Sequence, residues 1–168
     1  RLAREHKLPL QQVYRTVDGG FNQHYGYDNI VRNNIFAFGK EYQVTGPRAE
    51  DHLSFTFERN IVYWDEGLFG GGDWTGSGVE CQCGLEIPSK KYLAAGEDPW
   101  HLKQDCRHVR ADNNIYYDAR REAIFFYGEP FSKWQSHGND TNSLVADPRF
   151  VNAENYDFRL RPDSPALK

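Results

Sequence analysis

The sequence contains no methionine, only three cysteines and no long apolar run. No segment approaches the ~20 consecutive apolar residues that cross a bilayer, so we expect no membrane span. Positive charge is not in excess, because 20 Lys and Arg stand against 24 Asp and Glu for a net charge of −4. Nucleic acid and anionic membrane surfaces are therefore not expected partners. The first residues lack the apolar segment of a signal peptide, and we expect the chain to be a piece of a longer protein.

Aromatic residues and glycine are abundant instead. Phe, Tyr and Trp make up 15% of the 168 residues, and there are 15 glycines. Aromatic side chains favour pleated, half-buried surfaces, whereas a helical bundle would be dominated by Ala, Leu, Glu and Lys. The composition therefore predicts an all-β chain, and its length fits one domain.

A short pattern recurs three times, each time with an asparagine before an isoleucine. The copies are 30–38, 55–64 and 109–117, and a half-copy occupies 11–16. Their aligned asparagines, Asn34, Asn60 and Asn114, are 26 and 54 residues apart. The longer gap indicates either an extra turn of the repeat or an insertion. Matched positions at such a period are typical of stacked repeat architectures.

The recurrent asparagine has two physical uses in a stacked structure. Asparagine tolerates the left-handed backbone conformation that turns a strand sharply. Stacked amides can also hydrogen-bond to one another in a ladder. We expect the isoleucines that follow, Ile35, Ile61 and Ile115, to superpose as an aliphatic stack inside the coil.

The repeat predicts a parallel β-solenoid, with an ordinary β-sandwich as the alternative. We assign residues 1–140 to its coils and 141–168 to an irregular, proline-punctuated closing tail. A cysteine-containing insertion is expected at about 73–108. The glycine-rich run 67–78 lacks the Lys-Ser/Thr ending of a phosphate-binding loop and is expected to be an ordinary loop. Residues 130–135 are compatible with a short helix.

The segments 21–26, 33–39 and 60–65, together with the closing segments 143–150 and 157–166, resemble the right-handed parallel β-helix repeat proteins related to pectate lyases. This resemblance implies a secreted, carbohydrate-active protein, either a glycoside hydrolase or a polysaccharide lyase. It also implies that this chain is a C-terminal fragment of a few coils. The main catalytic acids would then lie outside it.

Two functions remain open at this point. One is a segment of a polysaccharide-cleaving enzyme, and the other is a non-catalytic β-helix module for glycan binding or extracellular assembly. Polysaccharide or glycan is the expected partner in both cases. Further β-helix coils, or a second copy joined through the N-terminal end, are expected to cover that end.

Four residues are candidates for catalysis. His24 can act as an acid or base near neutral pH, although a structural role in a turn is equally compatible with a single histidine. Glu41 comes one period before Asp65 and Glu66, so stacking would bring these carboxylates to one edge. Paired carboxylates serve as acid and base in glycoside cleavage, and they can also bind Ca²⁺. The alternative is that they are ordinary solvated turn residues.

Five further residues are candidates for substrate binding: Tyr25, Tyr42, Arg48, Trp64 and Trp74. Aromatic faces stack on sugar rings, and an arginine can neutralise a uronate or sulfate. Because side chains alternate along a strand, we expect exposure chiefly of Trp64 and Trp74. For Arg48, an ion pair with a neighbouring acid is the alternative.

The cysteines allow two interpretations. A disulfide can join Cys106 to Cys81 or Cys83, as in small loops of oxidising compartments. Alternatively, Cys81, Cys83, Cys106 and His108 together supply four zinc ligands, although the C-x-C spacing is tighter than the usual knuckle. No cofactor is otherwise required. Asn139 begins an N-glycosylation sequon, which is meaningful only in a eukaryotic secreted protein.

Overall fold

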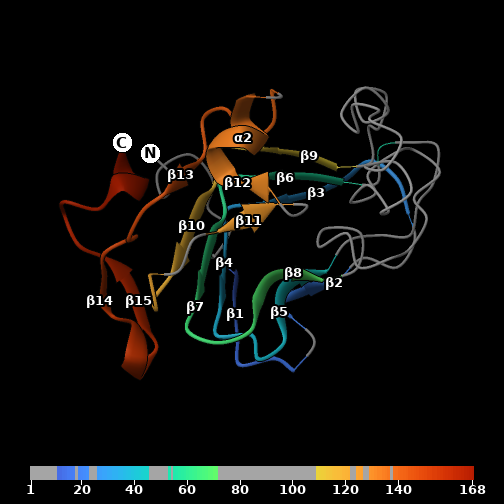
Figure 1. Ribbon diagram of the computed structural model, residues 1–168. Coiled ribbons are helices and arrows are strands. Elements are labelled where there is room, and N and C mark those ends of the chain that lie inside the picture. Colours follow the sequence, from blue (N-terminus) through green and yellow to red (C-terminus); the bar gives the residue numbers. More distant parts are fainter. Residues whose placement is uncertain are drawn as a thin grey trace.

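The computed structural model describes residues 11–17, 19–22, 26–45, 53, 55–71, 109–121, 124–126, 129–136 and 138–168. Strands dominate these residues, as the composition predicted (Figure 1). Three parallel sheets account for most of them. Sheet A has five strands: β1 (Gln11–Tyr14), β4 (Asn34–Ala37), β7 (Ile61–Trp64), β10 (Ile115–Asp118) and β13 (Leu144–Val145). Sheet B contains β2 (Phe21–Asn22), β5 (Tyr42–Thr45) and β8 (Leu68–Gly71), and sheet C contains β3 (Asn29–Arg32), β6 (Phe55–Glu58) and β9 (Val109–Asp112).

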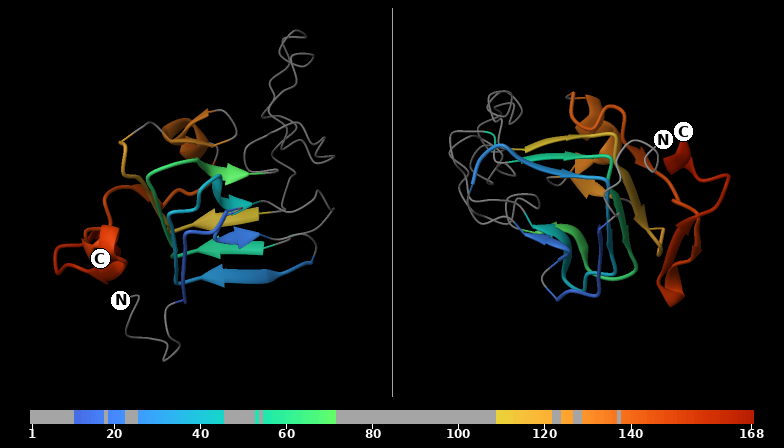
Figure 2. Two further views of the ribbon diagram at one scale, coloured as in Figure 1. Left: turned by 90° about the horizontal axis from the view of Figure 1, so that it is seen from below. Right: turned by 180° about the vertical axis from the view of Figure 1, so that it is seen from behind.

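Consecutive strands fall into sheets A, B and C in rotation. We call three consecutive strands, one from each sheet, a layer. Each strand pairs in parallel with the strand at the same place in the next layer, as β3 does with β6 and β6 with β9. Figure 2 shows the parallel strands stacked on one another (left) and the three sheets arranged around a common interior (right). The predicted repeat is therefore the unit of strand pairing.

The register answers the question left by the unequal spacing of the repeat. β7 pairs directly with β10, and Ile61 is the partner of Ile115. No additional layer separates these copies, so the extra residues of the longer gap lie between β8 and β9. The predicted insertion at 73–108 falls in this interval and lies outside the described residues.

The interior is filled by aromatic and aliphatic side chains from all three sheets. Buried members include Phe36, Val44, Phe55, Phe57, Val62, Trp64, Phe69 and Tyr116. In sheet A these are alternate positions of each strand, because successive side chains point to opposite faces. Ring pairs such as Phe36 with Phe57, at 5.8 Å between centroids, join neighbouring sheets. This contact network explains the aromatic-rich composition.

The isoleucine stack is real, but its predicted place inside the coil is wrong. Ile35, Ile61 and Ile115 are register partners and are all buried. They belong to a second apolar cluster, on the other face of sheet A, together with Phe150, Phe158 and Ala166 of the C-terminal segment. The positions that follow the isoleucines face the interior instead. Since side chains alternate along a strand, only one of the two sets can point inward.

The C-terminal segment covers that outer face of sheet A (Figure 2, right). It consists of the antiparallel pair β14 (Phe150–Asn152) and β15 (Asp157–Leu160) and the short helices η2 (Ala153–Asn155) and η3 (Pro165–Leu167). Tyr156 stacks on Tyr14 of β1 at 4.8 Å, while Phe150 contacts Tyr63 of β7 at 5.6 Å. The segment therefore spans several layers and shields apolar side chains that would otherwise face water.

The asparagine ladder is confirmed. The Oδ1 atom of Asn60 accepts hydrogen bonds from the backbone N and Nδ2 of Asn34 at 3.0 and 3.1 Å. The Oδ1 atom of Asn114 in turn accepts from the backbone N of Asn60 at 2.9 Å. Ser143 continues the ladder through its hydroxyl, which accepts from the backbone N of Asn114 at 2.8 Å. Asn60, Asn114 and Ser143 are almost completely buried, and these bonds satisfy their polar groups.

The left-handed conformation was assigned to the wrong residue of the pattern. The positive φ angles belong to Asn33, Arg59 and Asn113, each directly before a ladder asparagine. The turn therefore uses one left-handed residue to change direction. The residue after it supplies the amide that joins the layers.

A polar network and a helix close the end of the interior beside β10. The helix α2 (Phe131–Ser136), predicted at 130–135, packs Phe131 against Tyr116. Asp140 is buried and accepts hydrogen bonds from Ser143 Oγ at 2.6 Å, Tyr116 Oη at 2.9 Å and Trp134 Nε1 at 3.0 Å. A small hairpin, β11 (Phe125–Phe126) with β12 (Glu129–Pro130), leads into α2. Within the described part of the chain, no helix has the length and apolar character that a bilayer crossing requires.

Candidate functional site

The predicted carboxylates lie on the connections from sheet A to sheet B. The connection after β4 is fixed by Gln43, whose buried amide donates to Gly39 O and accepts from Gly39 N, both at 2.8 Å. A side chain at Gly39 would not fit, because its Cβ would lie 2.2 Å from the carbonyl oxygen of Tyr42. The bend is therefore rigid, and it presents Lys40 and Glu41 to solvent.

The next connection packs directly on the first. An added Cβ at Gly67 would lie 2.3 Å from the carbonyl oxygen of Lys40 and 2.6 Å from that of Glu41. Gly67 has a φ of +70°, so glycine is needed for both conformation and space. Asp65 and Glu66, the residues just before it, are exposed. Stacking thus places the connection that carries Asp65 and Glu66 against the one that carries Lys40 and Glu41, with Gly67 next to Glu41. We call Lys40, Glu41, Asp65 and Glu66 the turn edge.

Arg120 of the following layer supports the turn edge. Its Nη2 atom donates to Gly67 O at 3.0 Å and to Asp118 Oδ2 at 2.6 Å. Asp118 is buried, and burial, the largest influence, acts to raise its pKa. Hydrogen bonds and charge from Arg120, with a further hydrogen bond from Trp64, outweigh this and hold the pKa of Asp118 below its ordinary value. Arg120 is therefore fixed by a carboxylate that stays ionised.

The turn edge offers exposed carboxylates next to basic groups. Carboxylates of this kind can accept hydrogen bonds from sugar hydroxyls or exchange protons with a glycosidic oxygen and water. Among the described residues, no three His, Cys, Asp or Glu side chains gather closely enough to hold a metal ion, and calcium binding stays a prediction. The arrangement therefore fits polar recognition or acid–base chemistry at an open surface.

Trp64 cannot serve as a sugar-stacking platform, and the prediction of its exposure is wrong. Its side chain is 2% exposed and packs in the interior against Phe69. The physical reason is the strand period, because Trp64 lies two residues after the interior residue Val62 and therefore shares its face. Tyr42, at the start of β5, is half-buried and lies beside the turn edge in sequence.

Several other predicted residues lie outside the described residues: His24, Tyr25, Arg48, Trp74, Cys81, Cys83, Cys106 and His108. Two described strands end just before three of these residues in the sequence. His24 and Tyr25 come just after β2, and Arg48 comes shortly after β5. The last residues of these two strands, Asn22 and Thr45, are register partners. The disulfide and zinc interpretations of the cysteines stay predictions.

Asn139 of the sequon is half-buried beside α2. The residue between the two sequon positions is the buried Asp140, while Thr141 is exposed. Burial raises the pKa of Asp140, against the opposing effect of the hydrogen bonds that it accepts. The sequon therefore coincides with the network that closes the interior.

A row of polar side chains on sheet C went unnoticed in the sequence. Arg32 Nη1 lies 3.7 Å from Glu58 Oε1, and Asp112 accepts from the backbone N and Nδ2 of Asn142, both at 2.8 Å. Partial burial, the largest influence, acts to raise the pKa of Asp112, but the bonds from Asn142 outweigh it and lower that pKa. These groups pair with one another along the stacking direction, so the row is best explained as a link between layers.

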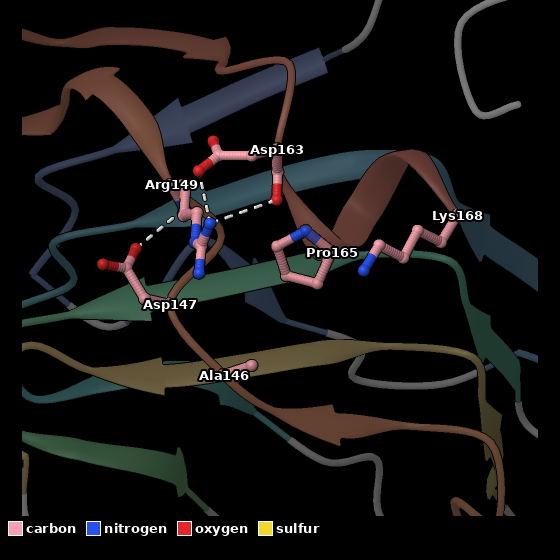
Figure 3. Close-up of a pocket in the computed structure, with 6 residues that line it drawn as sticks. All are labelled: Ala146, Asp147, Arg149, Asp163, Pro165 and Lys168. Atoms are coloured by element: carbon pink, nitrogen blue, oxygen red, sulfur yellow. Dashed lines mark hydrogen bonds and ion pairs between the residues drawn. The ribbon is translucent and has the colours of Figure 1, made fainter.

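A hollow of about 430 Å³ in the C-terminal segment was also missed. Figure 3 shows the residues that line it: Ala146, Asp147, Arg149, Asp163, Pro165 and Lys168. The sequence signal was present, but the Asp-Pro-Arg and Pro-Asp-Ser-Pro motifs indicated only turns. Their side chains come from two segments that converge only after the C-terminal segment folds back.

The chain is similar in sequence to a curated bacterial protein. The chain is 28% identical to the uncharacterized protein YwoF of Bacillus subtilis (strain 168) over 158 residues, which cover 83% of this chain and 31% of that protein. The chain thus spans about a third of the length of this curated relative. No family model and no solved structure matches the chain.

Proposed function

We propose that this chain forms consecutive coils of a right-handed parallel β-helix in a secreted protein that cleaves polysaccharide, and that the turn edge contacts the glycan. The carrying observation is the rotation of successive strands through three parallel sheets in register. A chain that visits three sheets in turn and returns one strand further on describes a helical path. Connections between parallel strands of one sheet are almost always right-handed.

The asparagine ladder and the interior aromatic stack support this proposal. Identical side chains lie above one another only if each coil repeats the path of the previous one, as Asn60 and Asn114 do. Such stacking also aligns side chains on the outside at the spacing of neighbouring strands, about 4.8 Å. An extended polymer with its own short repeat can meet a surface of this kind residue by residue.

The turn edge supplies the chemistry that cleavage needs. Hydrolysis of a glycosidic bond requires one carboxyl group that protonates the leaving oxygen and one that activates water or attacks the sugar. Glu41 and Glu66 lie on adjacent connections, because Gly67, the residue after Glu66, packs against the carbonyl oxygens of Lys40 and Glu41, and both glutamates are exposed. We assign them as the acid–base candidates of this chain, with Asp65 beside them. Additional carboxylates would come from coils outside it, since the relative is about three times as long.

The alternative is a non-catalytic module that binds glycan. The turn edge is an exposed surface, and acid–base catalysis works best where a carboxyl group is shielded enough for its pKa to approach the working pH. A surface that only recognises hydroxyl groups has no such requirement. Binding without turnover is therefore the second outcome that experiment must distinguish.

The test uses the purified chain with a panel of neutral and uronate-containing polysaccharides. Hydrolysis is read from new reducing ends, lyase activity from the ultraviolet absorbance of unsaturated uronates, and binding from retardation in polysaccharide-containing native gels. Glu66→Gln and Glu41→Gln keep the shape of each side chain and remove its charge. Glu154→Gln, at an exposed glutamate of η2, is the matched control.

Turnover that falls at least tenfold in Glu66→Gln or Glu41→Gln, but not in Glu154→Gln, supports the enzyme. Gel retardation without products, weakened by the same two variants, supports the binding module. If no polysaccharide is cleaved or retarded, or if all three variants behave like the parent, the proposal is wrong.

A further inference from the structure

The hollow of the C-terminal segment combines charged and apolar side chains, as small-molecule sites do. Its volume of about 430 Å³ falls within the range of small-molecule sites. None of its lining residues belongs to the turn edge. Two segments form its walls, 146–149 after β13 and 163–168 around η3.

Arg149 is held in place on one wall. Its Nη1 atom forms an ion pair with the carboxylate of Asp163, and its backbone N donates to Asp147 Oδ1 at 2.7 Å. Figure 3 shows the guanidinium between these two acids, with its other terminal nitrogen turned toward the side of the hollow where Ala146 lies. Both side chains of the pair remain accessible, at 49% and 62% exposure. The groups are thus ordered yet able to reach a ligand.

The charges in the hollow balance. Asp147 and Asp163 supply two negative charges, and Arg149 and Lys168 supply two positive charges. An anionic ligand would be repelled by the two carboxylates, and a cationic one would be repelled by the two basic groups. A neutral ligand rich in hydroxyl groups suits both, because each hydroxyl can donate to a carboxylate and accept from a cation. The ring of Pro165 and the methyl group of Ala146 add apolar surface for the C–H face of such a ligand.

We propose that this hollow is a binding site for a neutral sugar unit, separate from the turn edge. The inference rests on the proposed function, since a polysaccharide bound by the chain would supply such units. It makes a specific statement about substrate class: the glycan contains neutral pyranose residues, and a purely uronate polymer does not occupy this site.

The test measures binding of short neutral oligosaccharides, such as xylo- and cello-oligosaccharides, and of oligogalacturonates to the purified full chain by calorimetry and ligand-observed NMR. Asp147→Ala removes an acceptor, and Lys168→Gln removes an exposed ammonium group while keeping the hydrogen bond from the Lys168 backbone N to Pro165 O. Glu154→Gln is the control in the same segment, and Glu66→Gln tests the turn edge.

We expect a neutral oligosaccharide to bind, with affinity about tenfold lower in Asp147→Ala and in Lys168→Gln, since each change removes hydrogen bonds to a charged group. Glu154→Gln should leave this binding unchanged. Equal affinity in the parent and in Lys168→Gln, or tighter binding of oligogalacturonates than of neutral sugars, would overturn the inference. Polysaccharide binding that depends on Glu66 but not on Asp147 or Lys168 would retain the proposed function and reject the hollow. If no saccharide binds at all, both are wrong.

Discussion

Replacing Asn60 with alanine tests the stacking of layers most directly. Asn60 is 1% exposed, and its amide contacts both neighbouring layers. Its Oδ1 atom accepts two hydrogen bonds from Asn34, and its Nδ2 atom donates to Val31 O at 2.9 Å and to Asn114 Oδ1 at 3.4 Å. Alanine removes all four bonds and provides no replacement.

The expected loss is large for one side chain. A hydrogen bond contributes about 1 kcal/mol net, and a buried group left without a partner costs about 1–3 kcal/mol. We therefore expect Asn60→Ala to lower the free energy of unfolding by about 3–4 kcal/mol. Asn34→Ala is the matched control at the end of the ladder. Among the described residues, its side chain forms two hydrogen bonds, both from Nδ2 and one of them exposed, so its loss should cost about 1 kcal/mol.

The measurement is urea unfolding followed by tryptophan fluorescence. Trp64 and Trp134 are 2% and 7% exposed and report on the interior. Equal midpoints and slopes for Asn60→Ala and Asn34→Ala would show that the ladder does not hold the layers together. A loss below about 1 kcal/mol for Asn60→Ala would refute the same reasoning.

Three further outcomes follow from the described contacts. Gly67→Ala should destabilise the chain by more than Gly138→Ala. Both glycines have a positive φ, but only at Gly67 would the new Cβ meet backbone, at 2.3 Å from a carbonyl oxygen. Thermal unfolding of the two variants measures the difference. Burial, with the nearby charges of Tyr117 and three carboxylates, raises the pKa of Tyr63 from 10.0 to about 12. The folded state thus holds the phenol proton more tightly, so this contribution to stability is complete below pH 10 and is lost toward pH 12. Tyr63→Phe should flatten the fall in urea midpoint over that interval, and an unchanged profile would contradict the assignment. Asp140→Ala should lower the free energy of unfolding by about 3 kcal/mol or more in the same urea assay, because several buried donors lose their acceptor together. A urea midpoint close to that of the parent would show that the network is dispensable.

The repeat made the strand arrangement predictable. Asn34, Asn60 and Asn114 share sequence neighbours because each performs the same task in its layer, and a task that repeats leaves a periodic signal. The pairing of the three copies was accessible in this way, whereas the all-β class came from the composition and the helix at α2 from its local sequence. The stacking of the two connections that carry Glu41, Asp65 and Glu66 follows from the same period, although these residues are 24 and 25 positions apart and the repeat is 26; their role in catalysis stays a prediction.

The sequence could not assign faces within sheet A. Ile35 and Phe36 are both apolar, and so are the residues at the matching positions of the next layers. When neighbouring positions of a strand are both apolar, the sequence does not show which of them faces the interior and which faces the opposite side of the sheet. The choice depends on the C-terminal segment, whose Phe150 and Phe158 cover the isoleucine side. The burial of Trp64 follows from that choice.

Sequence alone determined the repeat, the amide ladder and the stacking of the connections after β4 and β7, because each depends on contacts between positions one period apart. Tertiary structure decided which face of sheet A points inward, which residue of each turn is left-handed, and where the hollow around Arg149 lies. Those features depend on segments such as 146–149 and 163–168, which share no period with the repeat. Their meeting is set by how the C-terminal segment packs on sheet A, and local sequence carries no record of that contact.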